Sequence, residues 1–437
     1  MILPGKVQYI LHRLQSAGFS AYAVGGCVRD SLMGTVPKDW DICTSALPAQ
    51  MKQVFREEHL VETGILHGTL TIILDHIPYE ITTYRLDGNY TDHRHPDSVR
   101  FVDQIDRDLS RRDFTINAMA CDLSGNILDL FEGQADLEKR TVRCVGDPEK
   151  RFEEDALRIL RALRFASVLD FHIDPDTASA IRRLYPTLDL VAPERIRTEL
   201  VKMLCGAGVG RILREYTDVI TFLIPCLKAS VGYHQDNPHH LYTVWEHTIR
   251  AVEQVPPDPV LRVTMLLHDS GKPFTRTTDD KGIGHYRGHQ QYSARLAEEV
   301  LNHLRFDRAT SNRIISLVEA HDIPLSTERR ILLRRLNRFG EEDLRSLFLI
   351  HQADRIATGT RNQEHAREHC QELNRALDLL LSEKPCFTLK DLAVHGEDLI
   401  SLGYRGREIG EKLEELLTKV MDGEIENSKE KLLSILS

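Results

Sequence analysis

Apolar residues follow two different spacings along this chain, and the change between them divides it into two parts. Residues 5–18 carry apolar side chains every three or four positions and end at Gly18, which predicts a helix with a glycine cap. Short runs rich in β-branched or aromatic residues follow and predict strands. These runs are 21–24, 69–74 and 79–84, with 128–130 and 142–145 as further candidates. Strands mixed with helices up to about residue 145 predict an α+β head.

After residue 146 the spacing becomes helical. Apolar residues from Phe152 to Phe165 share one face of an expected helix, and helical spacing continues almost to residue 437. Stretches with Pro or Gly interrupt it near residues 225–240, 254–259, 270–290 and 382–388. We therefore expect an α+β fold in which the head is followed by an all-helical neck and body, a further helical domain and a tail. The expected boundaries are 1–145, 146–225, 226–360 and 361–437.

Composition narrows the class of protein. The 437 residues are 41% apolar and 28% charged, which is ordinary for a globular chain. The eight cysteines include no CxxC pair, so neither a zinc ribbon nor a dithiol redox site is indicated and reduced thiols are expected. A signal-peptide pattern and an apolar run of about 20 residues are both absent, so we expect a cytoplasmic protein with no membrane partner.

The overall charge is acidic, but its distribution is uneven. With 66 acidic and 56 basic residues the net charge is −10, which argues against binding nucleic acid through the whole surface. Residues 150–214, however, hold 12 Lys or Arg against 9 Asp or Glu. This segment can therefore offer a locally basic face to RNA while the chain as a whole stays anionic.

Two glycines lie between an expected strand and an expected helix in residues 24–30 (Val-Gly-Gly-Cys-Val-Arg-Asp). Glycines at such a turn let backbone N–H groups approach a phosphate, and Arg29 adds a positive charge. The alternative is a tight turn in which Arg29 pairs with Asp30 or is solvated.

Three acidic residues of the head are candidates for a metal site. If residues 38–42 form a strand, Asp39 and Asp41 lie on one face, where their repulsion favours a cation between them. Carboxylate oxygens suit Mg²⁺. Glu80, on another expected strand, is either a third carboxylate or a structural partner for an arginine. The alternative for the pair itself is an exposed strand edge.

Two arginine-rich motifs follow. In residues 111–118 (Arg-Arg-Asp-Phe-Thr-Ile-Asn-Ala), the arginines are candidates for holding a triphosphate, with Asn117 making a local hydrogen bond. On a helix, Asp155 and Arg158 would be neighbours, and Arg161 and Arg164 would continue their ridge. A carboxylate beside a guanidinium can match the hydrogen-bonding edge of a base. The alternatives are a surface patch for the first motif and ordinary ion pairs for the second.

The order and spacing of these motifs closely resemble the class II tRNA nucleotidyltransferases, the bacterial CCA-adding enzymes and their poly(A) polymerase relatives. The resemblance covers residues 20–215 almost continuously, including residues 195–200, and returns near 388–437. It implies a polymerase-β-like head, in-line nucleotidyl transfer with two Mg²⁺, and a tail that binds tRNA. The residues it implies for these roles are Asp39 and Asp41 for Mg²⁺, with Glu80 near the metals, Gly26, Arg29 and Arg112 for the triphosphate, Asp155 and Arg158 for the base, and Arg161 and Arg164 as support.

A polar segment, residues 87–96, lies between head elements. In the resembled family a loop here is associated with addition of the terminal A. It therefore favours full CCA or A addition over CC addition alone, whereas the alternative is a solvent loop.

A second set of residues, between about 230 and 360, carries metal-ligand chemistry. His247, the pair His268-Asp269 and Asp354 occur in an order that resembles the HD phosphohydrolase superfamily. The resemblance implies a divalent transition metal held by these four residues, with His289 and His321 as ligands in two-metal versions and Lys272 steadying a phosphate. The alternative is a degenerate HD domain that has a structural role and no catalytic activity.

Three hypotheses for function follow. The first is template-independent addition of CCA to tRNA 3′ ends from CTP and ATP, with an A-adding enzyme or poly(A) polymerase as its nearest alternative and no DNA partner expected. The second is hydrolysis by the HD-like module, with the head holding RNA. The third is RNA binding without catalysis, which the acidic and basic residues in every head motif disfavour.

Overall fold

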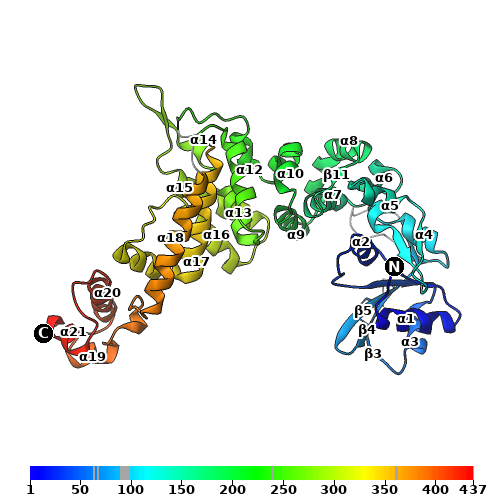
Figure 1. Cartoon of the computed structure of the whole chain (residues 1–437), viewed down its shortest axis with the longest axis horizontal. Coiled ribbons are helices and arrows are strands. Elements are labelled where there is room, and N and C mark those ends of the chain that lie inside the picture. Colours follow the sequence, from blue (N-terminus) through cyan, green and yellow to red (C-terminus); the bar gives the residue numbers. More distant parts are fainter. Residues whose placement is uncertain (63, 66–67, 89–98, 239, 360–362, 437) are drawn as a thin grey trace. The chain divides into compact units, whose positions relative to one another are not determined.

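The structure is a computed structural model that describes residues 1–62, 64–65, 68–88, 99–238, 240–359 and 363–436 (Figure 1). The chain forms two compact units, Met1–Leu223 and Ile224–Ser437. The predicted loop at 87–96 falls mainly outside the described residues. No helix in the described part of the chain is long and apolar enough to span a membrane.

A seven-stranded sheet forms the centre of the first unit, in the order β3-β4-β5-β2-β1-β8-β9. Its strands are β1 (Ala21–Val24), β2 (Asp41–Thr44), β3 (His59–Val61), β4 (Thr69–Leu74), β5 (Ile77–Thr83), β8 (Met119–Cys121) and β9 (Ile127–Asp129). A separate pair joins β6 (Arg85–Asp87) and β7 (Val99–Phe101). Strands β2 and β5 run parallel, with Asp41 opposite Glu80, whereas the other pairs of the large sheet are antiparallel. The predicted β-containing head is confirmed.

Helices pack on both faces of this sheet. They are α1 (Gly5–Ser16), α2 (Gly26–Leu32), α3 (Pro48–Val54), α4 (Ile105–Ser110) and α5 (Gly133–Glu138), with a 3₁₀ turn η2 (Thr115–Asn117). Apolar residues of α1 and α3 pack in one core with Ile42 of β2 and Ile81 of β5. Because side chains alternate along a strand, Asp41 and Glu80 face away from that core. The predicted helix at 5–18 is confirmed, and Gly18 has a φ of +86° that favours glycine.

The rest of the first unit is mainly helical. Its elements are α6 (Pro148–Glu154), α7 (Leu157–Val168), α8 (Pro175–Leu184), η3 (Tyr185–Leu190), α9 (Pro193–Leu204), α10 (Val209–Glu215) and α11 (Thr217–Leu223). One short pair joins β10 (Thr141–Val142), which overlaps the start of the predicted strand candidate at 142–145, to β11 (His172–Ile173), which the helical spacing did not predict.

The second unit is built from helices and one small hairpin. Its elements are η4 (Pro225–Ser230), α12 (Val244–Gln254), α13 (Pro259–Leu267), α14 (Lys272–Thr275), β12 (Thr277–Thr278), β13 (Gly284–His285), α15 (His289–His303), α16 (Arg308–Ala320), α17 (Arg329–Ala357), α18 (Gln363–Ser382), η5 (Leu389–Asp391), α19 (Gly396–Ser401), α20 (Arg407–Met421) and α21 (Lys429–Leu436). Helix α17 bends at Gly340, whose φ is +73°. Leu344 and Phe348 of α17 share a core with Leu373 and Leu377 of α18. The expected division of this unit near residue 360 stays a prediction.

Candidate functional site

Two of the predicted acidic residues stand side by side on the face of the head sheet opposite the core of α1 and α3. Asp41 is the first residue of β2, and Glu80 is its neighbour across the β2–β5 ladder. Both line a cavity of 200 Å³. Asp39 precedes the strand instead of lying on it, so the hypothesis of a strand over residues 38–42 is wrong for residues 38–40 and right only for Asp41 and Ile42. The chain reaches the sheet only at Asp41, because Pro37 and Lys38 still belong to the preceding loop.

The charges around Asp41 favour a cation. Partial burial raises the pKa of the Asp41 carboxyl above its usual value. The guanidinium of Arg112 opposes this shift without cancelling it, and the carboxylate of Asp39 adds to it. No residue in the described ranges donates a hydrogen bond to the carboxylates of Asp39, Asp41 or Glu80. Asp41 and Glu80 on one face, with the Asp39 carboxylate near enough to raise the pKa of Asp41, suit a hard divalent ion such as Mg²⁺.

The glycine turn and its arginine lie beside this face. Gly25 has a φ of +84°, and a Cβ there would come within 2.8 Å of Arg112 Nη1, so the close approach requires glycine. Gly26 begins α2. Arg29 donates to Asn117 Oδ1 at 2.6 Å and to Asp30 Oδ1 at 2.8 Å, so it is held in place from two sides.

Sequence reasoning missed Asp108, which organises the arginine pair. This carboxylate is 1% exposed and accepts hydrogen bonds from Arg111 at 2.8 and 3.0 Å, while Arg112 Nη2 lies 3.5 Å away. Its position three and four residues before two arginines, the spacing at which ion pairs form on a helix, was the available signal. Arg111 and Arg112 line both the 200 Å³ cavity and a second one of 280 Å³, so they connect the carboxylates to the neck.

The second cavity contains the residues predicted to read a base. It is lined by Arg111, Arg112, Asp113, Asp155, Leu157, Arg158, Arg161 and Arg195. The structure therefore brings Asp155, Arg158 and Arg161 together and adds Arg195, which the sequence analysis gave only as part of a motif. Arg164 does not line this cavity, because it pairs with the buried Glu199 instead.

The predicted helix through Asp155 is wrong. Asp155 is extended (φ −143°, ψ 103°) and separates α6 from α7. Its Oδ1 accepts a hydrogen bond from the backbone N–H of Leu157 at 3.0 Å, and its Oδ2 pairs with Arg195 at 3.0 Å. A carboxylate that satisfies the first N–H groups of a following helix stabilises a break at that point. Asp155 therefore does not pair with Arg158, which bonds to Glu154 at 2.6 Å.

Asp113 fixes the position of Arg161 with two hydrogen bonds. Its Oδ2 accepts from Arg161 Nε at 2.8 Å and Nη2 at 2.6 Å, while Asn117 donates to Oδ1 at 3.2 Å. Burial alone would raise the pKa of Asp113, but Arg161 and Asn117 outweigh it and lower the pKa to about 2.

We expect Asp113→Asn to lower the free energy of unfolding of the first unit by about 2 kcal/mol at pH 7. This is less than the roughly 3–5 kcal/mol typical of a broken buried pair, since 35% of the Arg161 side chain is exposed. Because folding lowers the pKa of Asp113, its contribution is complete above about pH 4 and is lost as the pH falls toward 2. The difference between the two proteins should therefore narrow below pH 4.

Urea unfolding followed through Trp40, in a Trp245→Phe background, would measure this difference for the first unit. Asp75→Asn removes an exposed carboxylate that pairs with Lys6 and serves as the matched control. A difference that stays constant between pH 5 and pH 3 would contradict the assignment.

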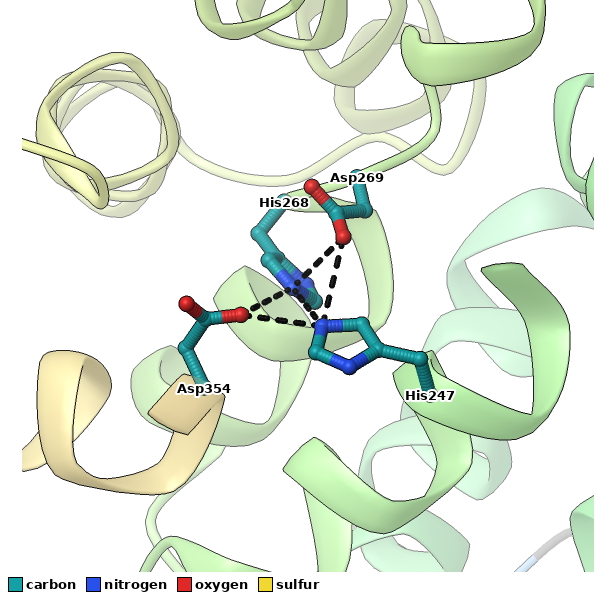
Figure 2. A group of neighbouring side chains, drawn as sticks. All are labelled: His247, His268, Asp269 and Asp354. Atoms are coloured by element: carbon teal, nitrogen blue, oxygen red, sulfur yellow. Dashed lines mark hydrogen bonds and ion pairs between the residues drawn. The ribbon is translucent and has the colours of Figure 1, made fainter. Parts of the chain in front are cut away.

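A separate cluster of ionisable side chains lies in the second unit, among α12, α13 and α17. His247, His268, Asp269 and Asp354 point toward one another (Figure 2). The separations of their facing atoms run from 2.9 Å, between His247 Nε2 and Asp354 Oδ1, to 3.5 Å, between His268 Nε2 and Asp354 Oδ1. The structure thus brings these four residues together, although the first and the last are more than 100 positions apart in the sequence.

A second group shares one residue with the first. His289, at the start of α15, and His321, at the end of α16, place their Nε2 atoms 3.2 Å apart. These atoms lie 3.4 and 3.7 Å from Asp269 Oδ1, whereas Asp269 Oδ2 faces His247 and His268. Asp269 therefore stands between two groups of metal-type ligands.

Backbone carbonyls fix which nitrogen of three histidines faces the centre. The Nδ1 atoms of His268, His289 and His321 each donate to the carbonyl three residues earlier at 2.7 Å. A carbonyl only accepts, so Nδ1 carries the hydrogen and the neutral ring presents the Nε2 lone pair to the cluster. Lone pairs about 3 Å apart repel one another unless a proton or a metal ion lies between them.

Charge and hydrogen bonding also fit a cation here. Both oxygens of the buried Asp269 carboxylate lack a well-aligned hydrogen-bond donor within the described residues, although Lys272 Nζ lies 2.6 Å from Oδ2. Burial alone would lower the pKa of His268, but Asp269 and Asp354 outweigh it and raise the pKa to about 10. Ligands about 2.0–2.1 Å from one ion lie roughly 3.0–3.4 Å apart, close to the observed separations.

A cavity of 320 Å³ opens onto this cluster. Lys272 and His240 line it, and Lys272 is held by Gln235 Oε1 at 3.1 Å as well as by Asp269. Sequence reasoning missed Gln235 and His240, since neither belongs to a recognisable pattern. Burial and the nearby Lys272 lower the pKa of His240 to about 4, so its imidazole is neutral at pH 7.

Family profiles match three segments of the chain. Residues 21–143 match "Poly A polymerase head domain", residues 170–229 match "Probable RNA and SrmB- binding site of polymerase A", and residues 289–436 match tRNA nucleotidyltransferase domain 2.

Individual proteins are similar over about half of the chain or over nearly all of it. The CCA-adding enzyme of Enterococcus faecalis is 33% identical over 430 residues, 97% of this chain and 93% of that protein. The CCA-adding enzyme of Ligilactobacillus salivarius is 49% identical over 214 residues, 49% of this chain and 52% of that protein. The crystal structure of the Bacillus stearothermophilus CCA-adding enzyme in complex with CTP has a TM-score of 0.76 and 28% identity, covering 100% of this chain and 97% of the other.

Proposed function

The chain belongs to the family of CCA-adding enzymes, and on that premise we propose that it adds CCA to tRNA 3′ ends from CTP and ATP. The observation that carries this proposal is the pair of connected cavities in the first unit. One is lined by the carboxylates of Asp41 and Glu80, the other by two carboxylates and several guanidinium groups at the neck, and Arg111 and Arg112 line both. A nucleoside triphosphate has the matching parts, a chain of phosphates and a hydrogen-bonding base.

In the proposed reaction the 3′ oxygen of the RNA forms a bond to the α-phosphorus of the nucleotide. The bond from that phosphorus to the bridging oxygen breaks, pyrophosphate leaves and the 3′ hydroxyl loses its proton. Asp39 and Asp41, with Glu80 beside them, would hold Mg²⁺, which supplies positive charge to the reacting oxygens. Arg29 and Arg112 are preorganised by Asn117 and Asp108, so they bind phosphate oxygens at little cost in ordering.

Base selection is assigned to the neck cavity. Arg195 and the N–H of Leu157 orient the Asp155 carboxylate, and Glu154 orients Arg158. An oriented carboxylate accepts a hydrogen bond from the exocyclic amino group that both cytosine and adenine carry. Arg158 donates hydrogen bonds to the acceptor atoms of the base ring. We infer that this arrangement discriminates CTP and ATP from UTP and GTP.

We expect Asp155→Ala to impair the choice of nucleotide more than the binding of RNA. Losing one oriented acceptor should reduce discrimination against UTP and GTP by about tenfold or more, because a good base contact contributes roughly 1–3 kcal/mol. Incorporation of each nucleotide measures selection, and a filter-binding assay measures tRNA affinity. Equal losses in both would contradict the role in base selection.

The function itself is tested with three substrates and each of the four nucleotides. The purified chain receives tRNA without CCA, tRNA ending in C and tRNA ending in CC. We expect C, C and then A to be added, with addition stopping after A. Incorporation of A but never C would favour the alternative, an A-adding enzyme or poly(A) polymerase.

We propose a second function, metal-dependent phosphoester hydrolysis in the second unit, because Asp269 lies between two groups of ligands. Water adds to phosphorus, the bond to the leaving oxygen breaks and that oxygen takes a proton. His247, His268, Asp269 and Asp354 would hold one divalent transition metal, and Asp269, His289 and His321 a second, which together supply Lewis acidity. Lys272 lies where it can bind a phosphate oxygen.

We propose a cytoplasmic location because the cysteines are present as thiols and not as disulfides. No disulfide joins the eight cysteines, all of which lie among the described residues. Burial raises the pKa of several of them, for example that of Cys27 to about 11, which keeps them as unreactive thiols. Thiols of this kind are typical of reducing compartments.

A further inference from the structure

Three arginines of the first unit surround the ring of Phe165 on α7. The guanidinium carbons of Arg164, Arg29 and Arg161 lie 3.9, 5.2 and 5.6 Å from the centroid of this ring. Phe165 is 6% exposed and the Arg29 side chain is 11% exposed. A guanidinium within about 6 Å of an aromatic centroid is attracted to the ring, and more strongly where water is excluded. The Phe165 ring therefore attracts three charged groups at once.

Each of these arginines also has an acidic partner of its own. The pairs are Arg29 with Asp30, Arg161 with Asp113 and Arg164 with Glu199. These carboxylates neutralise the guanidinium groups one by one, but three groups of like charge gathered around one point still repel each other. The Phe165 ring is a contact that all three share, and its attraction offsets part of that repulsion.

Two of the three arginines serve different parts of the nucleotide site. Arg161 lines the neck cavity, which is assigned to base selection, whereas Arg29 belongs to α2 and is assigned to phosphate oxygens. Asn117 connects them by hydrogen bonds, since it accepts from Arg29 at 2.6 Å and donates to Asp113 at 3.2 Å. Asp113 in turn accepts from Arg161 at 2.6 Å. The ring of Phe165 is thus a second connection between the same two arginines.

An edge contact fixes the orientation of the ring itself. The centroids of Phe165 and Phe114 are 5.7 Å apart, and the two planes differ by 76°. Phe114 is fully buried, so it holds the Phe165 ring as part of the core. A ring fixed in this way limits the rotamers of the flexible arginine side chains that lie over it, which lowers the entropy that they lose when they bind a nucleotide.

We propose that Phe165 is a positioning residue that keeps Arg29 and Arg161 in a fixed relation and so couples selection of the base to binding of the triphosphate. This proposal rests on the nucleotidyl transfer proposed above. Phe165 acts only through the two arginines. A displaced Arg29 weakens phosphate binding for every nucleotide, and a displaced Arg161 additionally weakens the binding of the correct base. The preference for CTP over UTP should therefore depend on the ring.

The test changes the charge distribution of the ring and nearly preserves its shape. In the full chain, Phe165 is replaced by phenylalanines that carry one, two or three fluorine atoms, because each fluorine weakens the attraction between the ring face and a cation. With Mg²⁺ and tRNA without CCA, we expect kcat/KM for CTP to fall stepwise, by about tenfold with three fluorines. The preference for CTP over UTP should fall by about threefold. The same series at Phe152, a fully buried residue of α6 outside this cluster, is the matched control.

A purely structural role would lower stability without changing the kinetics of the folded molecules, so circular dichroism at the assay temperature accompanies each measurement. Equal kcat/KM along the series, or a fall that leaves the preference for CTP over UTP unchanged, would overturn the coupling. Phe165→Tyr keeps the ring face and should retain both values, whereas Phe165→Leu should lose them. Equal kinetics of these two folded variants would also contradict the role of the ring.

A failure of the transferase function itself would give a different result. If the wild-type chain incorporates no nucleotide, that function fails, and calorimetric titration with CTP and UTP then decides the role of Phe165. An affinity for CTP that falls with each fluorine, and falls more than the affinity for UTP, supports the coupling. Equal affinities along the series, or no binding of either nucleotide, overturn it.

Discussion

Replacing both Asp39 and Asp41 by alanine is expected to lower nucleotide incorporation by about a thousandfold or more, with every tRNA substrate. Asp41 lines the cavity that Arg111 and Arg112 connect to the neck, and the Asp39 carboxylate lies near enough to Asp41 to raise its pKa. Both are oxygen ligands for Mg²⁺ in the proposed reaction. Loss of one preorganised electrostatic group already costs roughly 100-fold to 1,000-fold in many enzymes, and here two are removed. Radiolabelled CTP and ATP incorporation into tRNA without CCA measures the effect.

The same substitution should not destabilise the first unit. Folding raises the pKa of Asp41, so its ionised carboxylate opposes folding at neutral pH, and removing the charge should leave the free energy of unfolding unchanged or raise it. Asp75→Ala removes an exposed carboxylate from the turn between β4 and β5 and is the matched control. Incorporation within tenfold of wild type, in a variant that unfolds normally, would show that these carboxylates do not carry the reaction.

The first unit shows how far periodicity predicts structure. The spacing of Val7, Ile10, Leu11 and Leu14 is regular because one side of α1 packs on a sheet, so this helix and its end were predictable. The break at Asp155 was not. Apolar spacing continues from Phe152 into α7 without interruption, whereas the break depends on a side chain that bonds to Leu157 and to Arg195, 40 residues away.

The candidate sites differ in what sequence could provide. Asp41 and Glu80 were each identified, but their pairing is a property of sheet register, which local spacing does not encode. The six candidate ligand residues of the second unit, four histidines and two aspartates, were identified only by resemblance to a known order of residues. His240 lines the same cavity, and Gln235 accepts a hydrogen bond from Lys272, which also lines it. No sequence pattern marks these two residues, because their positions depend on tertiary packing.

Replacing His268 and Asp269 by alanine is expected to abolish phosphoester hydrolysis and metal binding in the second unit, while CCA addition continues at the wild-type rate. Asp269 belongs to both ligand groups, so its loss removes an oxygen from each. His268 is held by the carbonyl of Met265 and lies within 3.5 Å of three other ligands. Hydrolysis of a nucleotide ester and metal content per chain, measured by mass spectrometry, should both fall to background.

A second variant separates chemistry from folding. Alanine at two fully buried positions leaves a cavity, whereas Asp269→Asn keeps the volume and removes only the charge that binds a cation. Asp269→Asn should therefore lose metal and hydrolysis with little change in the far-ultraviolet circular dichroism spectrum. The Asp39→Ala plus Asp41→Ala protein supplies the reciprocal control, since it should hydrolyse the ester normally. If Asp269→Asn hydrolyses the ester at the wild-type rate, the reaction does not need the carboxylate that the two ligand groups share. The histidine cluster would then have a structural role only.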